Sequence, residues 1–354
     1  MKILFLTRFG HQGASSRLRL LQYLPWFRTS VIESVVSPLF DDTMLLRKYQ
    51  RGSYGFMALL LTYWRRFYVL ATANQYDLIW IEKEVLPWFP VWIEQWLLRK
   101  RLYVLDFDDA IFHNYDLHRF NWVRSFYGRR IDQLMEGSRL VAAGNRYLAS
   151  RAVAAGARWV EVIPTVVDVA RYSPKHEYPN SNVPLIVWIG SPSTVQYLLG
   201  LAKPLGTLAK LQSFTLRVIG ADAFNIPEVN IETFPWSLDT EAALIGECDI
   251  GIMPLKDTPW EQGKCAYKLI QYMACGLPTV ASPIGANKEV VIEGETGLFA
   301  DTPAEWVEKM QMLLRDTPLR QRLGRAGRER VQSDYSLQQT APRLAGLLAA
   351  AAVS

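Results

Sequence analysis

The stretch KCAYKLIQYMACGLPTVASPIGANKEVV, Lys264–Val291, decides the fold class of this chain of 354 residues. An apolar pattern at helical spacing stops at CGLP, and a short β-branched run, PTVAS, follows directly. A helix that leads through a glycine turn into a short apolar strand is typical of a parallel sheet covered by helices. The stretch therefore predicts an α/β architecture for the second half of the chain.

The same alternation recurs along the whole chain. We expect strands at KILFLT, DLIWIE, RLYVLDFDD, RLVAAGN and VEVIPTVVD, and then at LIVWIGS, TLRVIGA, VNIETFPW, IGIMPL and PTVAS. The polar stretch 172–184, YSPKHEYPNSNVP, lacks apolar periodicity and is interpreted as a linker. We predict two doubly wound Rossmann-like domains, 1–171 and 185–334, and a C-terminal helix at roughly 335–354 that packs back on the first domain.

The composition limits the class of protein. Half of the residues are apolar and no repeat appears, so we expect a globular chain. Cys248, Cys265 and Cys275 are odd in number and lack metal-ligand spacing, which argues against a disulfide framework or a zinc site. The N-terminus has no signal-peptide layout and is expected to be a buried strand. These features favour a cytoplasmic protein.

The net charge of +5 is concentrated in the segment 47–101, which holds nine basic and four acidic residues. Extended to residue 122, the segment holds six of the twelve tryptophans. Arg65 and Arg66 interrupt its longest apolar run, so no membrane-spanning helix is expected. Two interpretations stay open: a peripheral surface for anionic lipid, or a buried helix with a solvated basic face. Nucleic acid is not expected, because no known nucleic-acid-binding module surrounds the basic residues.

Lys264, Lys268 and Gln271 recur at helical spacing in the opening stretch. If residues 265–275 are helical, the lysines lie one turn apart and Gln271 lies one further turn along the same stripe. Gly263 allows close backbone approach, and the first-turn amides add partial positive charge. This arrangement suits a diphosphate, with Gln271 placed to bond a ribose hydroxyl. The alternative is a solvated polar stripe without a ligand.

Several motifs of the second half carry a resemblance to a known family. They are CDIGIMP, YMACGLPTVAS, the glycine at 285, EGETGLF and the earlier VIPTVVDVARYSP. With them the chain resembles GT-B glycosyltransferases of family 4, the glycosyl transferases group 1. The resemblance implies a GT-B fold, in which two Rossmann-like domains face each other across a cleft. It also implies retaining transfer of a sugar from a nucleotide diphosphate sugar to a hydroxyl acceptor, with no essential metal or other cofactor.

The chain departs from the pattern of this family in its Glu-x7-Glu helix. The position of the second glutamate, which by resemblance binds the donor ribose, is Gln271, and the position of the first is Gly263. Glutamine still donates and accepts hydrogen bonds but brings no charge.

A second departure follows the first strand of the second domain. Where the family usually has Arg and Lys on the diphosphate, this chain has IGSPST, so Gly190, Ser191 and Ser193 offer only amides and hydroxyls. We expect Lys264 and Lys268 to supply the missing charge.

The turn GHQGASSRLRL after the first strand resembles the glycine-rich loop that faces the donor pyrophosphate and the acceptor. Gly13 would allow close approach, and Ser15 or Ser16 would cap the following helix. We expect Ser16 and Arg17 to bind the acceptor, with Arg17 reaching an anionic group. An ordinary capped helix start accounts for the same residues.

The acidic cluster LDFDDAIFH gives the candidate catalytic residues. Asp106 and Asp108 match an Asp-x-Asp metal motif of another glycosyltransferase fold, but the two-domain layout argues against that assignment. By resemblance, Asp108 or Asp109 lies beside the donor sugar and orients a hydroxyl or accepts the acceptor proton. Asp109 as the N-cap of the next helix is the alternative.

Trp236 in TFPWS is expected beside the nucleotide base, with a packing role as the alternative. Glu82, Glu84, Asn145 and Arg146 follow strands and are lesser candidates.

We therefore expect a hexosyltransferase whose partners are a nucleotide-sugar donor and a glycan or lipid-linked acceptor in envelope or polysaccharide biosynthesis. It would lie in the cytoplasm, peripherally on the inner face of the membrane. The alternative is a non-catalytic nucleotide- or glycan-binding protein on the same scaffold, because the glutamate pair is absent. An oxidoreductase is disfavoured, because no G-x-G-x-x-G follows the first strand.

Overall fold

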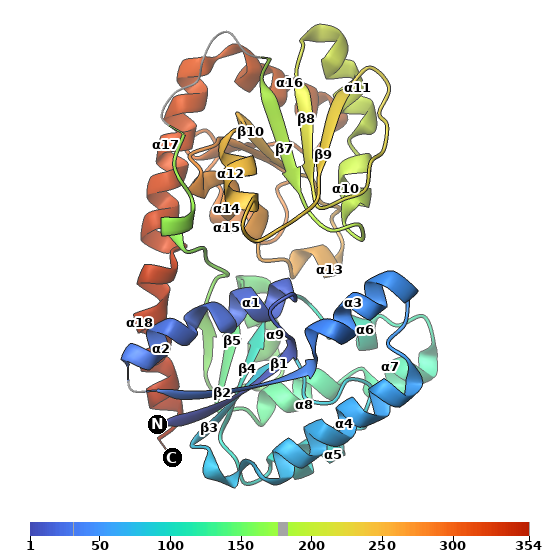
Figure 1. The fold of residues 1–354 in the computed structure, drawn as a ribbon, viewed down its shortest axis with the longest axis vertical. Helices are drawn as coiled ribbons and strands as arrows, with labels where there is room; N and C mark the ends of the chain where they lie inside the picture. The colour runs from blue at the N-terminus through green and yellow to red at the C-terminus, as the bar shows by residue number, and fades with distance from the viewer. Residues whose placement is uncertain (31, 176–182, 354) are drawn as a thin grey trace. The chain divides into compact units, whose positions relative to one another are not determined.

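A computed structural model describes residues 1–30, 32–175 and 183–353, which form two compact units (Figure 1). Unit 1 comprises Met1–Thr165, Gln262–Cys265 and Thr340–Ser354, and unit 2 comprises Val166–Glu261 and Ala266–Gln339. Unit 1 therefore draws segments from both ends of the chain. The expected linker, 172–184, includes residues 176–182, which lie outside the described residues.

Unit 1 contains a parallel six-stranded sheet in the order β2-β1-β3-β4-β5-β6. Its strands are β1 (Lys2–Phe9), β2 (Glu33–Phe40), β3 (Leu78–Glu82), β4 (Tyr103–Phe107), β5 (Leu140–Ala143) and β6 (Val160–Val162). Every residue of β3 and β4 is buried, because helices cover both faces of these central strands. The strand order reverses between β1 and β3, and ligands of such sheets bind beyond the carboxyl ends of the strands at this switch point.

The edge strand β2 has no counterpart among the expected strands. Its sequence, ESVVSPLF, lacks a continuous apolar run, and its first four residues are exposed or half-exposed while Ser37, Leu39 and Phe40 are buried. Pro38 is tolerated because β2 pairs only with β1, and an edge strand leaves one row of its backbone groups unpaired.

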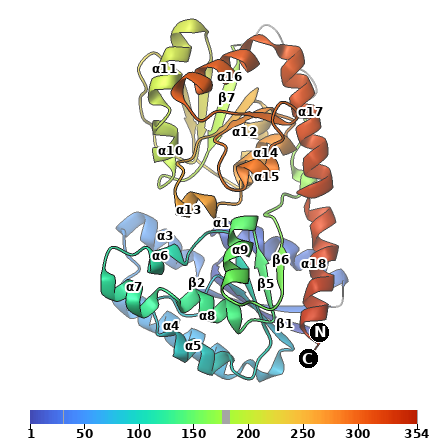
Figure 2. The same ribbon diagram turned by 180° about the vertical axis from the view of Figure 1, so that it is seen from behind.

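Helices cover both faces of the unit 1 sheet (Figures 1 and 2). α1, α2 and the part of α18 from Thr340 onward lie on one face, and α4, α5 and α8 lie on the other. The helices are α1 (Ala14–Arg19), α2 (Leu24–Thr29), α3 (Asp42–Arg51), α4 (Phe56–Ala71), α5 (Val91–Leu98), α6 (His113–Asp116), α7 (Asn121–Tyr127), α8 (Arg130–Glu136), α9 (Arg146–Ala154) and α18 (Leu337–Ala351). Short 3-10 turns lie at Leu21–Tyr23 and Ala73–Gln75.

Unit 2 contains a second parallel six-stranded sheet, in the order β12-β11-β10-β7-β8-β9. Its strands are β7 (Leu185–Ile189), β8 (Thr215–Ile219), β9 (Asn230–Phe234), β10 (Ile250–Met253), β11 (Thr279–Ala281) and β12 (Gly297–Phe299). The order reverses between β7 and β10, so the switch point of this sheet lies at their carboxyl ends.

Two hydrophobic cores, one on each face, hold the unit 2 sheet between its helices. α10 (Val195–Leu199), α11 (Ala202–Leu211) and α16 (Pro303–Arg315) pack in one core. α12 (Glu241–Gly246), α14 (Tyr267–Ala274) and α15 (Asn287–Val290) pack in the other. The remaining elements are the 3-10 turn Val169–Arg171, α13 (Pro259–Gln262) and α17 (Thr317–Asp334). Both units are thus doubly wound α/β structures.

The helix of the opening stretch is shorter than expected. α14 begins at Tyr267, and the preceding Ala266 has a φ of 52°, in the left-handed region that ends a regular helix. The amide of Asn145 donates to the carbonyl oxygens of Gln262, at 3.1 Å, and Lys264, at 3.0 Å, which holds this segment outside the helix. The prediction that Lys264 shares a helical stripe with Lys268 is therefore wrong.

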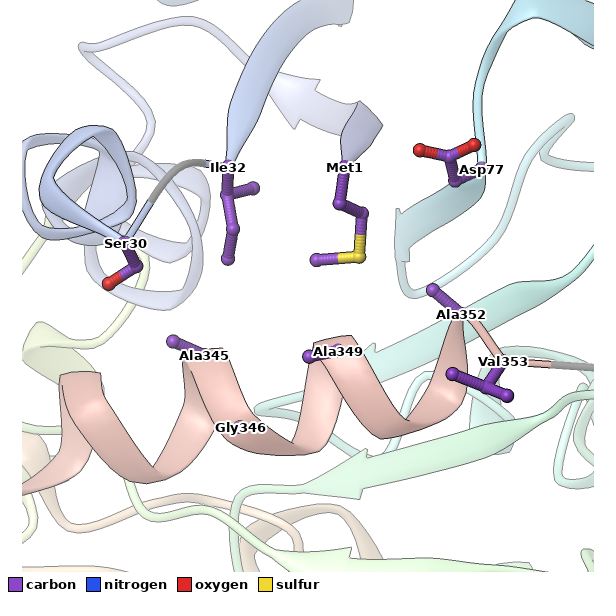
Figure 3. A pocket seen from close by; sticks show the side chains of 9 residues that line it. All are labelled: Met1, Ser30, Ile32, Asp77, Ala345, Gly346, Ala349, Ala352 and Val353. Carbon is purple, nitrogen blue, oxygen red and sulfur yellow. The ribbon is translucent and has the colours of Figure 1, made fainter.

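A pocket of about 660 Å³ lies in unit 1 between α18 and the chain segments that precede β1, β2 and β3 (Figure 3). It is lined by Met1, Ser30, Ile32, Asp77, Ala345, Gly346, Ala349, Ala352 and Val353. The carboxylate of Asp77 accepts a hydrogen bond from the backbone N–H of Lys2 at 2.7 Å. The pocket lies at the amino ends of the strands, away from the carboxyl ends at which the predicted site residues follow.

Candidate active site

At the switch point of unit 1, the carboxylate of Glu82 organises the loop after β1. Its Oε2 accepts hydrogen bonds from the backbone N–H of Arg8, at 2.7 Å, and from the hydroxyl of Ser16, at 2.6 Å. Its Oε1 accepts from the hydroxyl of Ser15. Glu82 is only 1% exposed, so these bonds form away from water and hold the loop in place. Glu82, only a lesser candidate from the sequence, is therefore the residue to which this loop is bonded.

The predicted loop residues have mixed outcomes. Gly13, and neither serine, is the N-cap of α1, and the N-cap prediction for Ser15 or Ser16 is wrong because both hydroxyls bond Glu82. A Cβ at Gly13 would lie 2.3 Å from that of Phe9, so only glycine fits this turn. Arg17 is half-buried and donates to the carbonyl oxygen of His11 at 3.0 Å. Ser16 is buried, so an acceptor role for its side chain would be indirect.

Asp108 and Asp109 follow β4 and share one cation. The ammonium of Lys83 lies 2.8 Å from Oδ1 of Asp108 and 3.3 Å from Oδ2 of Asp109. The ammonium of Lys264 lies 3.8 Å from Oδ1 of Asp109. Lys83 is 6% exposed and has a φ of 66°, so an unusual backbone conformation places its side chain under the two carboxylates.

This environment shifts the pKa values of Asp108 and Asp109 in opposite directions. Burial alone would raise the pKa of Asp108, but the Lys83 ammonium outweighs it, so the pKa of Asp108 is lowered. For Asp109, burial and repulsion by Asp108 outweigh Lys83 and Lys264, and its pKa is raised. Neighbouring carboxyl groups with pKa values pushed apart are typical of acid–base sites.

Asp106 is a structural residue, separate from that pair. Its carboxylate forms a bidentate ion pair with Arg19, with distances of 2.8 and 3.0 Å. Arg19 also donates to the carbonyl oxygen of Ile163 at 2.7 Å and to the hydroxyl of Thr165 at 3.3 Å. Burial raises the pKa of Asp106 to about 6, against the opposing effect of Arg19. The pair ties α1 to β4 and to the chain after β6.

Gly263 and Lys264 belong to unit 1, where they reach the acidic pair. A Cβ at Gly263 would lie 2.5 Å from that of Ala110, so the backbone packs directly on the loop after β4. Asn145 is the N-cap of α9, and its amide also binds this segment. The thiol of Cys265 donates to the carbonyl oxygen of Asp108 at 3.2 Å. This segment therefore belongs to the same site as Asp108 and Asp109. Asp109 does not cap α6, whose N-cap is Phe112.

In unit 2, Lys268 lies near the turn after β7. Its ammonium stands 4.2 Å from the centre of the Trp188 ring, in a cation–π contact. A Cβ at Gly190 would lie 2.4 Å from that ring, so the ring lies against the backbone of the turn. A half-buried cation thus stands beside a glycine at the carboxyl end of β7, at the switch point of the sheet.

The rest of this turn is a closed, polar loop. The hydroxyls of Ser191 and Ser193 lie 2.8 Å apart, and the backbone N–H of Ser191 donates to the hydroxyl of Thr194 at 3.0 Å. Ser191 and Ser193 are exposed, so their hydroxyls are accessible to a ligand.

Gln271 lies in a buried hydrogen-bond network. Its amide donates to the hydroxyl of Tyr172 at 3.0 Å. The Tyr172 hydroxyl in turn donates to Oε1 of Glu241 at 3.4 Å. The indole of Trp236 donates to Oε2 of Glu241 at 2.7 Å. Gln271 is 2% exposed and Glu241 is 3% exposed. Trp236 and Gln271, predicted separately, are therefore linked through Glu241 and Tyr172.

Each unit brings together one group of the predicted residues. Unit 1 holds Gly13, Ser16, Arg17, Asp108, Asp109, Gly263 and Lys264, and unit 2 holds Gly190, Ser191, Ser193, Trp236, Lys268 and Gln271. Lys83 and Glu241 have no place among the predicted residues. A signal existed for Lys83, which directly follows a strand between two glutamates. Glu241 gave no such signal, because its link to Gln271 runs through Tyr172, which lies 69 residues away from it in sequence. Among the described residues, no group of three or more His, Cys, Asp or Glu side chains could hold a metal ion.

Comparison with known proteins finds a family model that is similar to part of the second half of the chain. Residues 184–316 match the family described as Glycosyl transferases group 1. D-inositol 3-phosphate glycosyltransferase of Pseudarthrobacter chlorophenolicus is 30% identical over 131 residues, which cover 36% of this chain and 30% of that protein. An uncharacterized glycosyltransferase of Methanocaldococcus jannaschii is 32% identical over 95 residues, covering 26% of each chain. The chain thus spans less than a third of the length of these two curated relatives.

Solved structures resemble the whole chain. The Anabaena protein Alr3699/HepE, crystallised with UDP, has a TM-score of 0.74 at 17% identity, covering 99% of this chain and all of that one. The same protein was also solved with UDP-glucose. WaaG, a glycosyltransferase involved in lipopolysaccharide biosynthesis, has a TM-score of 0.68 at 12% identity, covering 98% and 99% of the two chains. The expected fold class, a GT-B arrangement of two Rossmann-like domains, is confirmed.

Proposed function

We propose that this protein transfers a hexosyl group from a nucleotide diphosphate sugar to a hydroxyl acceptor, because residues 184–316 match the glycosyl transferases group 1 family. A uridine diphosphate sugar is the first donor to test, because a protein of the same fold was crystallised with UDP-glucose. By resemblance to the family, the transfer would retain the anomeric configuration and need no essential metal or other cofactor.

One observation carries this proposal: the ammonium of Lys268 stands over Trp188 beside the Gly190 turn, at the switch point of unit 2. Ligands of doubly wound sheets bind there, and a diphosphate needs cations and hydrogen-bond donors. Lys268 supplies charge, and the exposed hydroxyls of Ser191 and Ser193 supply donors. The cation thereby takes the place of the Arg and Lys that the family usually has after this strand.

The proposed donor contacts differ in kind. Gly190, Ser191, Ser193 and Lys268 would touch the nucleotide diphosphate. Gln271 and Trp236 would act indirectly, because both bond to the network of Tyr172 and Glu241. In unit 1, Gly13, Gly263 and Lys264 are the proposed donor-binding residues, and Ser16 and Arg17 are the proposed acceptor-binding residues.

The chemical step assigns roles to the acidic pair of unit 1. The bond between the sugar anomeric carbon and the diphosphate oxygen breaks, and a bond from the acceptor oxygen to that carbon forms. The acceptor proton passes to Asp109, whose raised pKa suits a general base, or to the departing diphosphate. Asp108, kept ionised by Lys83, would orient a sugar hydroxyl. The acceptor we propose is a glycan or a lipid-linked saccharide of envelope or polysaccharide synthesis, used in the cytoplasm at the inner face of the membrane.

Thermal shift with a panel of nucleoside diphosphates tests the donor site. We expect one nucleotide to raise the unfolding midpoint of the wild type, and Lys268→Ala to reduce its affinity about tenfold or more. Lys210→Ala is the matched control, since Lys210 is an exposed lysine of α11 in the same unit. The same nucleotide sugar should then be hydrolysed or transferred. No shift with any nucleotide would contradict the proposal.

A second candidate is a non-catalytic nucleotide- or glycan-binding protein on the same scaffold. The observation that favours it is Gln271, which stands buried where the family has its ribose-binding glutamate. This candidate predicts a nucleotide-induced shift without sugar release or transfer. Detectable turnover of the donor would exclude it.

A further inference from the structure

Helix α4 of unit 1 exposes an apolar face to solvent and buries a cation. The exposed side chains, at 49–74%, are Phe56, Met57, Leu60, Leu61, Trp64 and Tyr68. Their spacing of three to four residues places them on one side of the helix. On the opposite side, Arg66 is 2% exposed and donates to the carbonyl oxygens of Thr7 and Ser37. Surface helices of globular proteins show the reverse pattern.

Helix α5 extends this apolar face. Figures 1 and 2 show α4 and α5 side by side, and Phe89, just before α5, stacks on Tyr63 of α4 with ring centres 5.1 Å apart. On α5, Trp92 and Trp96 are 65% and 59% exposed. We call the exposed face of α4 together with these two tryptophans the α4–α5 surface. Within the described residues, every exposed aromatic side chain lies between Phe56 and Phe126, so the surface is not a random scatter.

The charge that reaches solvent in this segment is positive. Of the four acidic residues between 47 and 101, Glu82, Glu84 and Glu94 are at most 5% exposed, and only Asp77 is exposed. Five basic side chains of the same segment are exposed: Arg47, Lys48, Arg65, Arg99 and Lys100. The interpretation of this segment as a buried helix with a solvated basic face does not fit, because the exposed face of α4 is apolar.

We propose that the α4–α5 surface docks unit 1 on an anionic phospholipid bilayer. Indole and phenol rings favour the headgroup level of a membrane, and apolar side chains enter the acyl boundary beneath it. The exposed lysines and arginines of the segment would bind the negative surface of anionic lipids. Among the described residues, no helix has the length and apolar character needed to cross a bilayer. The inference stands on unit 1 alone and does not depend on the identity of the donor.

Vesicle flotation tests the inference without any measurement of activity. Wild-type protein is mixed with vesicles of phosphatidylglycerol and phosphatidylethanolamine, or of phosphatidylcholine alone, and the floating fraction is measured from low to high salt. The apolar variant is Leu61→Ser/Trp64→Ser, and the charge variant is Arg65→Gln/Lys100→Gln. The matched control is Val153→Ser/Leu211→Ser, which changes exposed apolar residues elsewhere, at 64% and 53% exposure. Because all these side chains are exposed, the thermal midpoints should stay close to that of the wild type.

We expect the wild type to float with anionic vesicles and to be released by salt. The apolar variant should bind about tenfold more weakly or worse, the charge variant should need less salt for release, and the control should match the wild type. Equal binding to phosphatidylcholine, no flotation, or undiminished flotation of the apolar variant would overturn the inference. A wild-type dimer that the apolar variant dissociates, with no vesicle binding, would also overturn it and assign the surface to a second copy of the chain. Nucleotide shifts of the apolar variant should be unchanged, which separates this outcome from failure of the donor site.

Discussion

Arg19 and Asp106 form a bidentate ion pair with N–O distances of 2.8 and 3.0 Å, and each side chain is only 1% exposed. Removing one partner of such a pair leaves the other charge buried and uncompensated. We predict that Arg19→Met lowers the free energy of unfolding of unit 1 by about 3–5 kcal/mol. Urea unfolding followed by tryptophan fluorescence measures the change.

The double variant Arg19→Met/Asp106→Leu should recover a large part of this loss, since it leaves no unpaired charge. Glu308→Gln is the control, because Glu308 forms an exposed pair with Lys309 and should change stability by less than about 1 kcal/mol. If the loss of stability in the double variant equals the sum of the losses in Arg19→Met and Asp106→Leu, the two side chains are not energetically coupled.

Gln271→Glu would restore the residue type of the family but is predicted to destabilise unit 2. The new carboxylate would face the Tyr172 hydroxyl, which already bonds the carboxylate of Glu241, and would lose the donor that the amide supplies. We expect a loss of about 1–3 kcal/mol at pH 8. Burial raises the pKa of the new carboxyl at position 271 in the folded state above its value in the unfolded state. The Gln271→Glu protein should therefore be most stable at low pH, where this carboxyl is protonated, and should lose stability as pH rises through the folded-state pKa.

Unfolding midpoints at pH 5 and pH 8 measure this effect. Gln321→Glu, at an exposed position of α17, should show no comparable pH dependence. A stable Gln271→Glu protein with higher donor affinity would instead indicate that the ligand reaches this position directly.

We predict that the acidic pair, Asp108 and Asp109, sets the pH dependence of the proposed transfer. A general base works when deprotonated, so kcat/KM should fall as pH falls through the pKa of Asp109, which burial and Asp108 raise above its ordinary value. We call this fall of kcat/KM at low pH the acid limb of the profile. We predict that Asp109→Asn lowers kcat by about 10²–10⁴-fold and removes the acid limb. Lys83→Met should move the limb to higher pH, because it removes the cation that both carboxylates share.

The pH profile of kcat/KM between pH 4 and 9 measures these changes. Asp239→Asn, at an exposed position in unit 2, is the control. An acid limb that persists unchanged in Asp109→Asn would transfer the role of base to another group.

Two glycines should respond to the same substitution with opposite signs. A Cβ at Gly263 would lie 2.5 Å from the Cβ and 2.7 Å from the backbone N of Ala110, and backbone cannot move aside at low cost. We predict that Gly263→Ala destabilises unit 1 by about 1–3 kcal/mol. At Gly346, inside α18, nothing lies within 4 Å of the added Cβ, and Gly346→Ala should stabilise by about 0.5–1 kcal/mol. Urea midpoints of the two variants decide the matter, and equal effects would contradict the close packing at Gly263.

The parallel sheets could be predicted from sequence because central strands are buried on both faces and read as apolar runs. β3, with the sequence LIWIE, and β8, with TLRVI, are buried at every position. β2 escaped prediction because an edge strand needs only one covered face, and its serines and Pro38 break the run. Its place in the sheet comes from pairing with β1, which is not local information.

The candidate site shows the same limit. Asp108 and Asp109 could be selected because they directly follow a strand. The partner of Ser16 could not be predicted, since Glu82 lies 66 residues away in sequence. The Ser16 hydroxyl donates to the Glu82 carboxylate instead of capping the helix. Lys264 left the expected helix because the Asn145 amide, 119 residues away, binds its carbonyl oxygen. Local propensity predicts elements, but tertiary hydrogen bonds decide where their ends lie.

Unit 1 is built from three separate segments of the chain, which limits how it can be cut or exchanged. Its sheet is covered on one face by α18, whose Leu344 and Leu348 are buried and whose Arg343 bonds Glu161 at 2.8 Å. A fragment cut at Thr165 would therefore carry an uncovered apolar sheet face and aggregate, whereas the same fragment mixed with a peptide of residues 340–353 offers a route to complementation. Chimeras that exchange unit 1 between relatives must likewise move three pieces together: residues 1–165, 262–265 and 340–354.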